Sequence, residues 1–223
     1  MFWMMEGFVE LKDEAYREFL RGKLAFRKGE FEGEGYGFVR VRYKGKRIGY
    51  GYYNKRDKYP LRIYSLEKED FREALLENIK KAKKFREGLG FKDVYRLVYS
   101  DADWLPGLII DRYKDLFVMV YNSFLYSKNR SLISEVLLEI FSEISLYDKI
   151  KERFVVGEKR EAIIEEDGVR FIVRVDGQKT GFYLDQRENR ILFRKFLSGD
   201  EEVLDAFWYS GGFGMHALKK GCE

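Results

Sequence analysis

The first third of the chain alternates between apolar and polar residues, a pattern typical of strands that bury one face. Residues 38–43 and 47–53 follow this alternation and are joined by the turn Lys44-Gly45-Lys46, which predicts two strands of a small antiparallel barrel. Before them, residues 9–20 predict a short strand and a helix with an apolar face. Acidic residues and glycines dominate residues 30–35, and we expect an exposed loop there.

The middle of the chain contains both helical spacing and β-type runs. Apolar residues recur at helical spacing between Ser65 and Gly88 and over residues 132–144, which predicts two amphipathic helices. Strands are predicted for residues 94–99, 107–113, 116–121, 162–166 and 169–173. Asp167-Gly168 separates the last two strands and is the strongest hairpin signal in the chain.

The last quarter places a glycine-rich turn between a predicted strand and a predicted helix. The apolar run Val203–Phe207 suits a strand buried on both faces, and the helix begins near Phe213. Gly211, Gly212 and Gly214 would let a ligand approach the unpaired N–H groups of this helix, as in the first crossover of a doubly wound sheet. The spacing differs from the dinucleotide fingerprint, so a tight turn without a ligand is the alternative.

Composition excludes several kinds of site. With one cysteine, Cys222, and one histidine, His216, the chain cannot form an internal disulfide, a Cys-rich or His-based metal cluster, or a Ser-His-Asp triad. The loop aspartates Asp101 and Asp103 are interpreted as turn caps rather than as an acid–base pair. Charged residues make up 36% of the chain at a net charge of +4, and this usage suggests a thermophile. The sequence has no signal-peptide pattern and no apolar stretch of roughly 20 residues, which predicts a cytoplasmic protein with no membrane partner.

Positive charge is concentrated on the predicted barrel. Asp57 is the only acidic residue between Tyr36 and Tyr64, and tyrosines interleave with the basic residues. This combination suits phosphate contacts and base stacking with RNA. The alternative is a solvated barrel face with ordinary β-forming tyrosines. The candidate RNA-binding residues are Arg40, Arg42, Lys44, Lys46, Arg47, Lys55, Arg56 and Lys58.

A glycine-flanked segment, residues 177–190, precedes the glycine-rich turn. Asp185 and Glu188 are spaced as in a capping box, which predicts a helix start. The arginines of this helix are candidates for ligand contact or, equally, for a structural role. They fall on adjacent turns at Arg187, Arg190 and Arg194.

Four ordered motifs cover nearly the whole chain: residues 49–54 (Gly-Tyr-Gly-Tyr-Tyr-Asn), residues 105–113 (Leu-Pro-Gly-Leu-Ile-Ile-Asp-Arg-Tyr), residues 177–190, and residues 205–213 (Asp-Ala-Phe-Trp-Tyr-Ser-Gly-Gly-Phe). Together they resemble the class I S-adenosylmethionine-dependent rRNA methyltransferases with an N-terminal PUA domain, whose best-known members make 5-methylcytosine in large-subunit rRNA. The resemblance implies a multidomain protein of α/β and α+β class. Its expected parts are a PUA-like RNA-binding β-barrel over residues 1–68, a central α+β domain over 69–176, and the N-terminal part of a Rossmann-like methyltransferase domain over 177–223.

The resemblance also implies a cofactor, S-adenosyl-L-methionine. In that family the loop before the helix wraps the amino-acid part of the cofactor, and the segment matching residues 177–190 lies against the same pocket. Ser210 keeps the hydroxyl of the family's Thr, whereas Gly214 lacks the hydroxyl of the usual Ser. Residues 23–27 depart from the family's usual His-Pro-Trp-Val-Phe-like segment. The implied cofactor-binding residues are Tyr183, Asp185, Arg187, Asp205, Phe207, Tyr209, Ser210, Gly211, Gly212, Phe213 and Gly214.

A 5-methylcytosine enzyme needs a cysteine thiolate that attacks the pyrimidine ring. In the family that cysteine lies far downstream of the glycine-rich turn, and Cys222 matches no catalytic motif, so we interpret Cys222 as structural and expect this chain alone to be inactive. Two interpretations follow. The chain is a fragment or split half of an rRNA methyltransferase, completed by a second chain, or it is a non-catalytic RNA-binding PUA-like module. The expected partner in both cases is rRNA, and a homodimer stays open.

Overall fold

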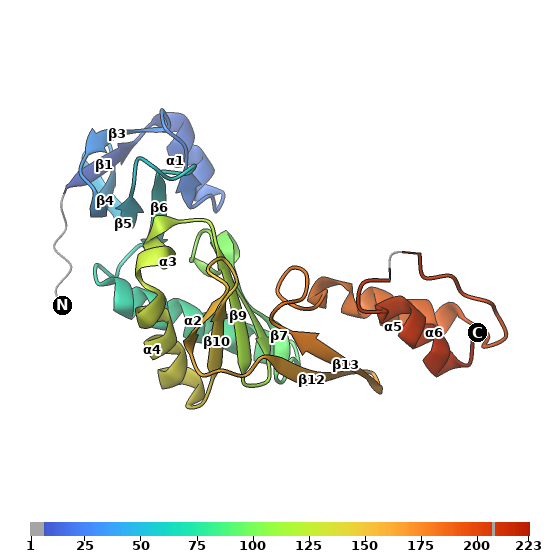
Figure 1. Cartoon of the computed structure of the whole chain (residues 1–223). Helices are drawn as coiled ribbons and strands as arrows, with labels where there is room; N and C mark the ends of the chain where they lie inside the picture. Colours follow the sequence, from blue (N-terminus) through green and yellow to red (C-terminus); the bar gives the residue numbers. More distant parts are fainter. Residues whose placement is uncertain (1–6, 207) are drawn as a thin grey trace.

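The computed structural model describes residues 7–206 and 208–223, which form three consecutive parts. Figure 1 shows a curled N-terminal sheet at one end, a central sheet flanked by helices, and a hairpin followed by two helices that extend away from the centre. We call this last part, residues 161–206 and 208–223, the C-terminal arm. No helix within the described ranges is long and apolar enough to cross a membrane.

The N-terminal sheet has six strands in the order β2-β6-β5-β4-β1-β3. Strand β1 runs parallel to β4 and the other pairings are antiparallel, so the sheet is mixed, whereas the alternation had predicted an antiparallel barrel. Apolar side chains such as Val9, Val39 and Ile63 form its core. The elements are β1 (Phe8–Leu11), α1 (Asp13–Leu20), β2 (Ala25–Phe26), β3 (Phe31–Glu34), β4 (Gly37–Tyr43), β5 (Lys46–Tyr53) and β6 (Leu61–Ser65).

Two local predictions for this sheet had different outcomes. The expected loop at residues 30–35 is wrong, because β3 lies there and pairs with β1. Gly33 permits the close approach: a Cβ at this position would stand 2.5 Å from the carbonyl oxygen of Phe8. The turn between β4 and β5 is confirmed, since Lys44 (φ 48°) and Gly45 (φ 75°) both adopt the left-handed conformation of a tight hairpin turn.

The central sheet has five strands in the order β11-β10-β9-β8-β7, all antiparallel except β9 and β10. Successive residues of its strands point to opposite faces of the sheet, and each face packs against its own apolar layer. Phe117 and Met119 pack with helices α2 and α4, whereas Leu116 and Val118 pack with the hairpin of the C-terminal arm. The elements are α2 (Phe71–Gly88), β7 (Val94–Tyr99), the 3-10 helix η1 (Ser100–Asp103), β8 (Leu108–Tyr113), β9 (Leu116–Tyr121), α3 (Phe124–Lys128), α4 (Arg130–Phe141), β10 (Ser145–Asp148) and β11 (Arg153–Val156).

The predicted start of the first long helix is wrong by six residues. Ser65 ends strand β6, and its hydroxyl accepts a hydrogen bond from the Lys68 N–H at 2.8 Å, which closes a turn. Helix α2 begins at Phe71 because Asp70 caps it, accepting from the Glu73 N–H at 2.9 Å. The second predicted helix ends at Phe141, three residues earlier than expected.

The C-terminal arm begins with the predicted hairpin. Asp167 (φ 47°) and Gly168 (φ 78°) form its turn, which confirms the Asp-Gly signal. The expected strand Val203–Phe207 is wrong over residues 203–206, where Leu204 is 90% exposed and no described strand lies alongside; Phe207 lies outside the described residues. The elements are β12 (Glu161–Glu166), β13 (Val169–Arg174), the 3-10 helix η2 (Leu184–Gln186), α5 (Arg187–Phe196) and α6 (Gly212–Lys220).

Candidate cofactor-binding site

The C-terminal arm contains a cavity of about 510 Å³ between two loops, residues 178–186 and residues 205–213. Six of the predicted cofactor residues line it. Asp185 and Arg187 lie outside it and line a neighbouring groove instead. Gly211 and Gly214 are not among its lining residues, and Phe207 is outside the described residues. The lining residues are Gln178, Tyr183, Gln186, Arg190, Asp205, Trp208, Tyr209, Ser210, Gly212 and Phe213.

Tyr209 joins the two loops. Its hydroxyl donates to the carbonyl oxygens of Gln178 and Gly181, at 3.2 and 3.3 Å, and its ring meets the Tyr183 ring edge-on at 5.1 Å. Gly177 makes room for this contact, because a Cβ there would stand 2.7 Å from the Tyr209 hydroxyl. The two segments that the sequence singled out separately therefore form one site.

The glycine-rich turn places a helix N-terminus beside the cavity. Gly211 adopts φ 66° and α6 begins at Gly212, one residue before the predicted start. Asp205 accepts a hydrogen bond from the Gly214 N–H at 3.1 Å, so a side chain from the preceding loop caps the helix. Gly214, which lacks the hydroxyl of the usual Ser, thus contributes its backbone N–H to this cap. The first N–H groups of α6 have no intrahelical acceptor and favour negatively charged ligand groups.

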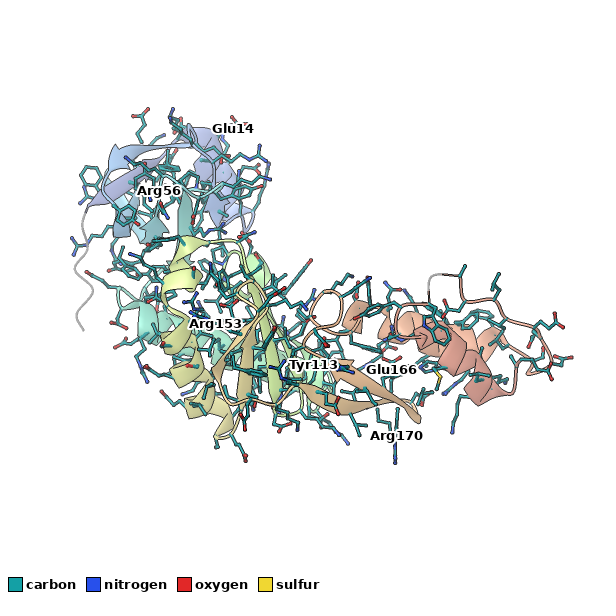
Figure 2. The ribbon with its side chains drawn as sticks, viewed as in Figure 1. Glu14, Arg56, Tyr113, Arg153, Glu166 and Arg170 are labelled. Carbon is teal, nitrogen blue, oxygen red and sulfur yellow. The ribbon has the colours of Figure 1, made fainter. Side chains whose placement is uncertain are left out.

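A buried ion cluster holds the cavity's inner wall. The Arg190 guanidinium donates to both carboxylate oxygens of Glu166 at 2.6 and 2.7 Å, and also to the Tyr183 carbonyl at 3.0 Å. The Nε2 atom of His216 lies 3.0 Å from one carboxylate oxygen of Glu166, and the Nε atom of Arg187 lies 3.6 Å from the other. Glu166 and Arg190 are each 2% exposed. We call these four side chains, Glu166, Arg187, Arg190 and His216, the Glu166 cluster; Figure 2 labels Glu166 between the hairpin and the helices.

The Glu166 cluster explains Arg187 and Arg190 of α5, whereas Arg194 pairs with Asp167 at the hairpin turn. Burial lowers the pKa of His216, against the opposing effect of its hydrogen bond to Glu166. A Cβ on Gly212 would stand 2.7 Å from Cδ of the clamped Arg190, so a side chain at Gly212 would disturb the cluster. The capping-box prediction is wrong, because α5 begins at Arg187 after a 3-10 turn and no side chain of Asp185 caps it.

A second polar cluster ties the cavity's other loop to the central sheet. Asp111, fully buried on β8, accepts from the Arg96 guanidinium at 2.8 and 3.0 Å and from the Thr180 hydroxyl. The Tyr113 hydroxyl lies 3.2 Å from the same Thr180 oxygen. Asp111 and Thr180 both fall inside the motifs noted in the sequence, but nothing there paired them. Glu166 could have been found, because the alternation of β12 puts it on the buried face with Ala162 and Ile164.

The candidate RNA-binding residues form two groups rather than one face. Arg42 and Arg47 are cross-strand partners on β4 and β5, and Arg40 precedes them on the same face. Lys44 and Lys46 lie at the adjoining turn, whereas Lys55, Arg56 and Lys58 lie in the loop at the opposite end of β5. Several are already engaged: Arg40 pairs with Glu69 at 3.1 Å and Lys44 with Asp13 at 3.6 Å, while Arg42 and Arg47 lie over the rings of Phe8 and Tyr50.

The tyrosines expected to stack on bases are partly unavailable. Tyr50 and Tyr52 are 7% and 5% exposed and belong to the core shared with α2. Tyr59 is more accessible and lies under the guanidinium of Arg27 at 5.4 Å. Within residues 7–206 and 208–223, no group of three or more His, Cys, Asp or Glu side chains is arranged to hold a metal ion.

The chain is similar in sequence to ribosomal RNA large subunit methyltransferases. No family model matches the chain. The chain is 41% identical over 193 residues to "Putative ribosomal RNA large subunit methyltransferase MJ1653" of Methanocaldococcus jannaschii, an alignment that covers 81% of this chain and 49% of the relative. It is 36% identical over 198 residues to "Ribosomal RNA large subunit methyltransferase I" of Vibrio parahaemolyticus, covering 80% of this chain and 50% of the relative.

A solved structure shares the fold. A crystal structure described as "a putative methyltransferase complexed with SAH" superposes with a TM-score of 0.78 at 19% identity, over 98% of this chain and 61% of that one. The chain spans about half the length of the curated relatives it matches. It is therefore homologous to the N-terminal half of ribosomal RNA large subunit methyltransferases.

Proposed function

We propose that this chain forms the cofactor-binding and RNA-contacting part of an S-adenosylmethionine-dependent methyltransferase that modifies large-subunit rRNA. The observation that carries the proposal is the cavity between residues 178–186 and 205–213, at the segments that resemble the family's cofactor motifs. The names of the homologous proteins support rRNA as the substrate class. A cytoplasmic location stays a prediction.

The residues present fit the cofactor. A volume of about 510 Å³ lies within the range of small-molecule sites, roughly 300–1,000 Å³. Trp208 and Phe213 offer apolar surface, the Asp205 carboxylate suits an ammonium group, and the first N–H groups of α6 suit a carboxylate. When bound, S-adenosylmethionine supplies an electrophilic methyl group. In this proposal Asp205 and Tyr209 orient the amino-acid part, and Tyr183, whose ring meets the Tyr209 ring at 5.1 Å, forms the adjoining wall.

The N-terminal sheet is the proposed RNA-contacting part. We propose that it is a PUA-like domain over residues 1–68, followed by a central domain over 69–176 and the methyltransferase part from 177 onward. The exposed basic residues at the β4–β5 turn and in the loop after β5 would contact phosphates at two separate places. The two-group arrangement favours contact with a folded RNA rather than with a single strand lying along one face.

The proposed product is 5-methylcytosine, for which a cysteine thiolate is required. Cys222 does not suit that role. It is 4% exposed, its thiol donates to Glu201 at 3.4 Å, and burial raises its pKa, so the reactive thiolate is disfavoured. We therefore propose that residues outside this chain supply the nucleophile and that the chain by itself transfers no methyl group.

Calorimetric titration with S-adenosylhomocysteine tests the cofactor assignment. We expect one site per chain, and we expect Asp205→Asn to weaken binding by about tenfold or more, because a charge-assisted hydrogen bond contributes roughly 1.5–3 kcal/mol. Asparagine can still cap α6 through its side-chain oxygen. Glu202→Gln is the matched control: it removes the same charge three residues before Asp205, at an exposed position outside the cavity.

Equal affinity of Asp205→Asn and Glu202→Gln would refute the role given to Asp205. A chain that binds rRNA but shows no heat with S-adenosylhomocysteine up to millimolar concentrations would contradict the cofactor assignment as a whole. That result would favour the non-catalytic RNA-binding interpretation.

A further inference from the structure

A groove of about 400 Å³ lies on the other side of the segment that walls the cofactor cavity. Tyr183 and Gln186 face the cofactor cavity, whereas Leu184 and Arg187 face this groove. The end of α2, the start of β7 and the loop between them form its far side, with Phe91 in that loop. We call it the Phe91 groove. Only the segment 183–187, which contains η2, would separate a ligand held there from the cofactor cavity.

The Phe91 groove combines exposed aromatic and apolar surface with guanidinium groups. Tyr99 is 52% exposed and Leu89 is 61% exposed. The guanidinium of Arg96 lies 5.3 Å from the Tyr99 ring centre, and that of Arg187 lies 5.6 Å from the Phe91 ring centre. Rings and guanidinium planes arranged together are the surfaces on which unpaired RNA bases stack.

Buried carboxylates hold two arginines of the groove, Arg86 and Arg96, in place. Asp111 binds Arg96 through two hydrogen bonds, and Asp103 binds Arg86 in the same bidentate manner. The Asp103 and Asp111 side chains are 7% and 0% exposed, whereas the Arg96 side chain is 31% exposed. The Arg96 side chain is therefore partly exposed in the groove, while Asp103 and Asp111 balance the charges of Arg86 and Arg96. This arrangement suits a planar base with one phosphate better than a run of phosphates.

We propose that the Phe91 groove holds one unpaired base of the RNA substrate, stacked on Tyr99, beside the nucleotide that is modified. The inference rests on the proposed function, because it takes RNA to be the substrate. The anchored Arg96 faces the same base, and the segment 183–187 links the groove to the cofactor cavity. Stacking at this point would read an unpaired nucleotide without reading its identity, since every base has a π-face.

The test measures binding of a single-stranded RNA of about 12 nucleotides to the whole chain by fluorescence anisotropy. We expect Tyr99→Ala to weaken binding by about tenfold, the loss of one stacked base, without changing the slope of affinity against salt. Phe196→Ala is the matched control: this aromatic residue is 80% exposed and lines neither cavity. An oligomer of the same length without bases should bind wild type and Tyr99→Ala equally.

Three results would overturn the inference. If Tyr99→Ala binds the RNA as wild type does, the groove holds no base, although the rRNA substrate class stands. If the variant changes the sedimentation behaviour of the chain rather than its RNA affinity, the groove is a contact between copies of the chain. If wild type does not bind the single-stranded oligomer, this inference fails; the proposed substrate fails only if wild type also does not bind folded large-subunit rRNA.

Discussion

The central sheet and the C-terminal arm bury different kinds of side chain. In the central sheet, Phe117 on one face and Val118 on the other are both fully buried between apolar layers. In the arm, the apolar residues Phe196 and Leu204 are 80% and 90% exposed, whereas the charged pair of Glu166 and Arg190 is buried. Apolar burial therefore stabilises the central part together with the hairpin of the arm, whereas the helices of the arm are held by the Glu166 cluster and by a smaller aromatic contact, Phe193 with Phe213 at 5.5 Å.

This difference bears on the stability of the proposed cofactor cavity. Both of its loops belong to the arm, and the clamped Arg190 forms part of its wall. Removing one partner of a buried ion pair is strongly destabilising, and a part of a protein can unfold locally while the rest stays folded. We expect the cavity to be lost by changes that leave the central sheet folded.

The largest effect is expected where apolar burial dominates. Phe117→Ala should lower the free energy of unfolding of the central part by about 3–5 kcal/mol, because it removes a fully buried ring that packs against Phe141 at 4.9 Å. Thermal and denaturant unfolding followed by circular dichroism measure the change. Phe196→Ala removes an equal ring from an exposed site in the arm and should change stability by less than about 0.5 kcal/mol. Similar losses from both variants would contradict the contrast between the two parts.

A somewhat smaller effect, confined to the arm, is expected from Glu166→Gln. The variant leaves the buried Arg190 without its carboxylate, which should destabilise the arm by about 3 kcal/mol and weaken binding of S-adenosylhomocysteine. Hydrogen exchange, read separately for α5, α6 and the central strands, measures where protection is lost.

The neighbouring Glu165 provides the control for that variant. Its side chain is 62% exposed on the opposite face of β12, where it lies 3.9 Å from Arg170, and Figure 2 shows Arg170 pointing away from the helices. Glu165→Gln should leave exchange and cofactor affinity unchanged. Loss of protection in the central strands of Glu166→Gln would show that the two parts do not unfold separately.

Local patterns predicted much of the fold. The bounds of β7 and β9, and both hairpin turns, follow from alternation and turn chemistry within a few residues of chain. Strands β10 and β11 were missed because each has only four residues and is defined by its distant partners. The run at residues 203–206 has strand composition, but a strand also needs a neighbour to accept its hydrogen bonds.

The sequence predicted where along the chain the candidate site lies, but not the side-chain contacts that build it. Glycine positions and Asp205 identified the turn, since the constraints there are local. The Glu166 cluster was missed because its partners Arg190 and His216 lie 24 and 50 residues further along the chain. Residue type also gave no sign that Glu166 and Arg190 are buried, because charged residues are normally expected at the surface.

The smallest effect is a pH dependence at the end of the arm. The Glu201 carboxylate accepts from the N–H groups of Ser198 and Gly199, at 2.7 and 2.9 Å, and these bonds lower its pKa to about 2 from an ordinary value of 4.5. The folded state thus binds a proton less readily than the unfolded state, so the stabilisation is present above pH 4.5 and is lost as the pH falls from 4.5 towards 2. Exchange protection of the Ser198 and Gly199 amides should decline over that interval in wild type. In Glu201→Gln it should be lower at neutral pH and flat, while Glu202→Gln should follow wild type. A wild-type profile that stays flat below pH 4.5 would show that hydrogen bonds of this solvated carboxylate do not contribute to holding the arm.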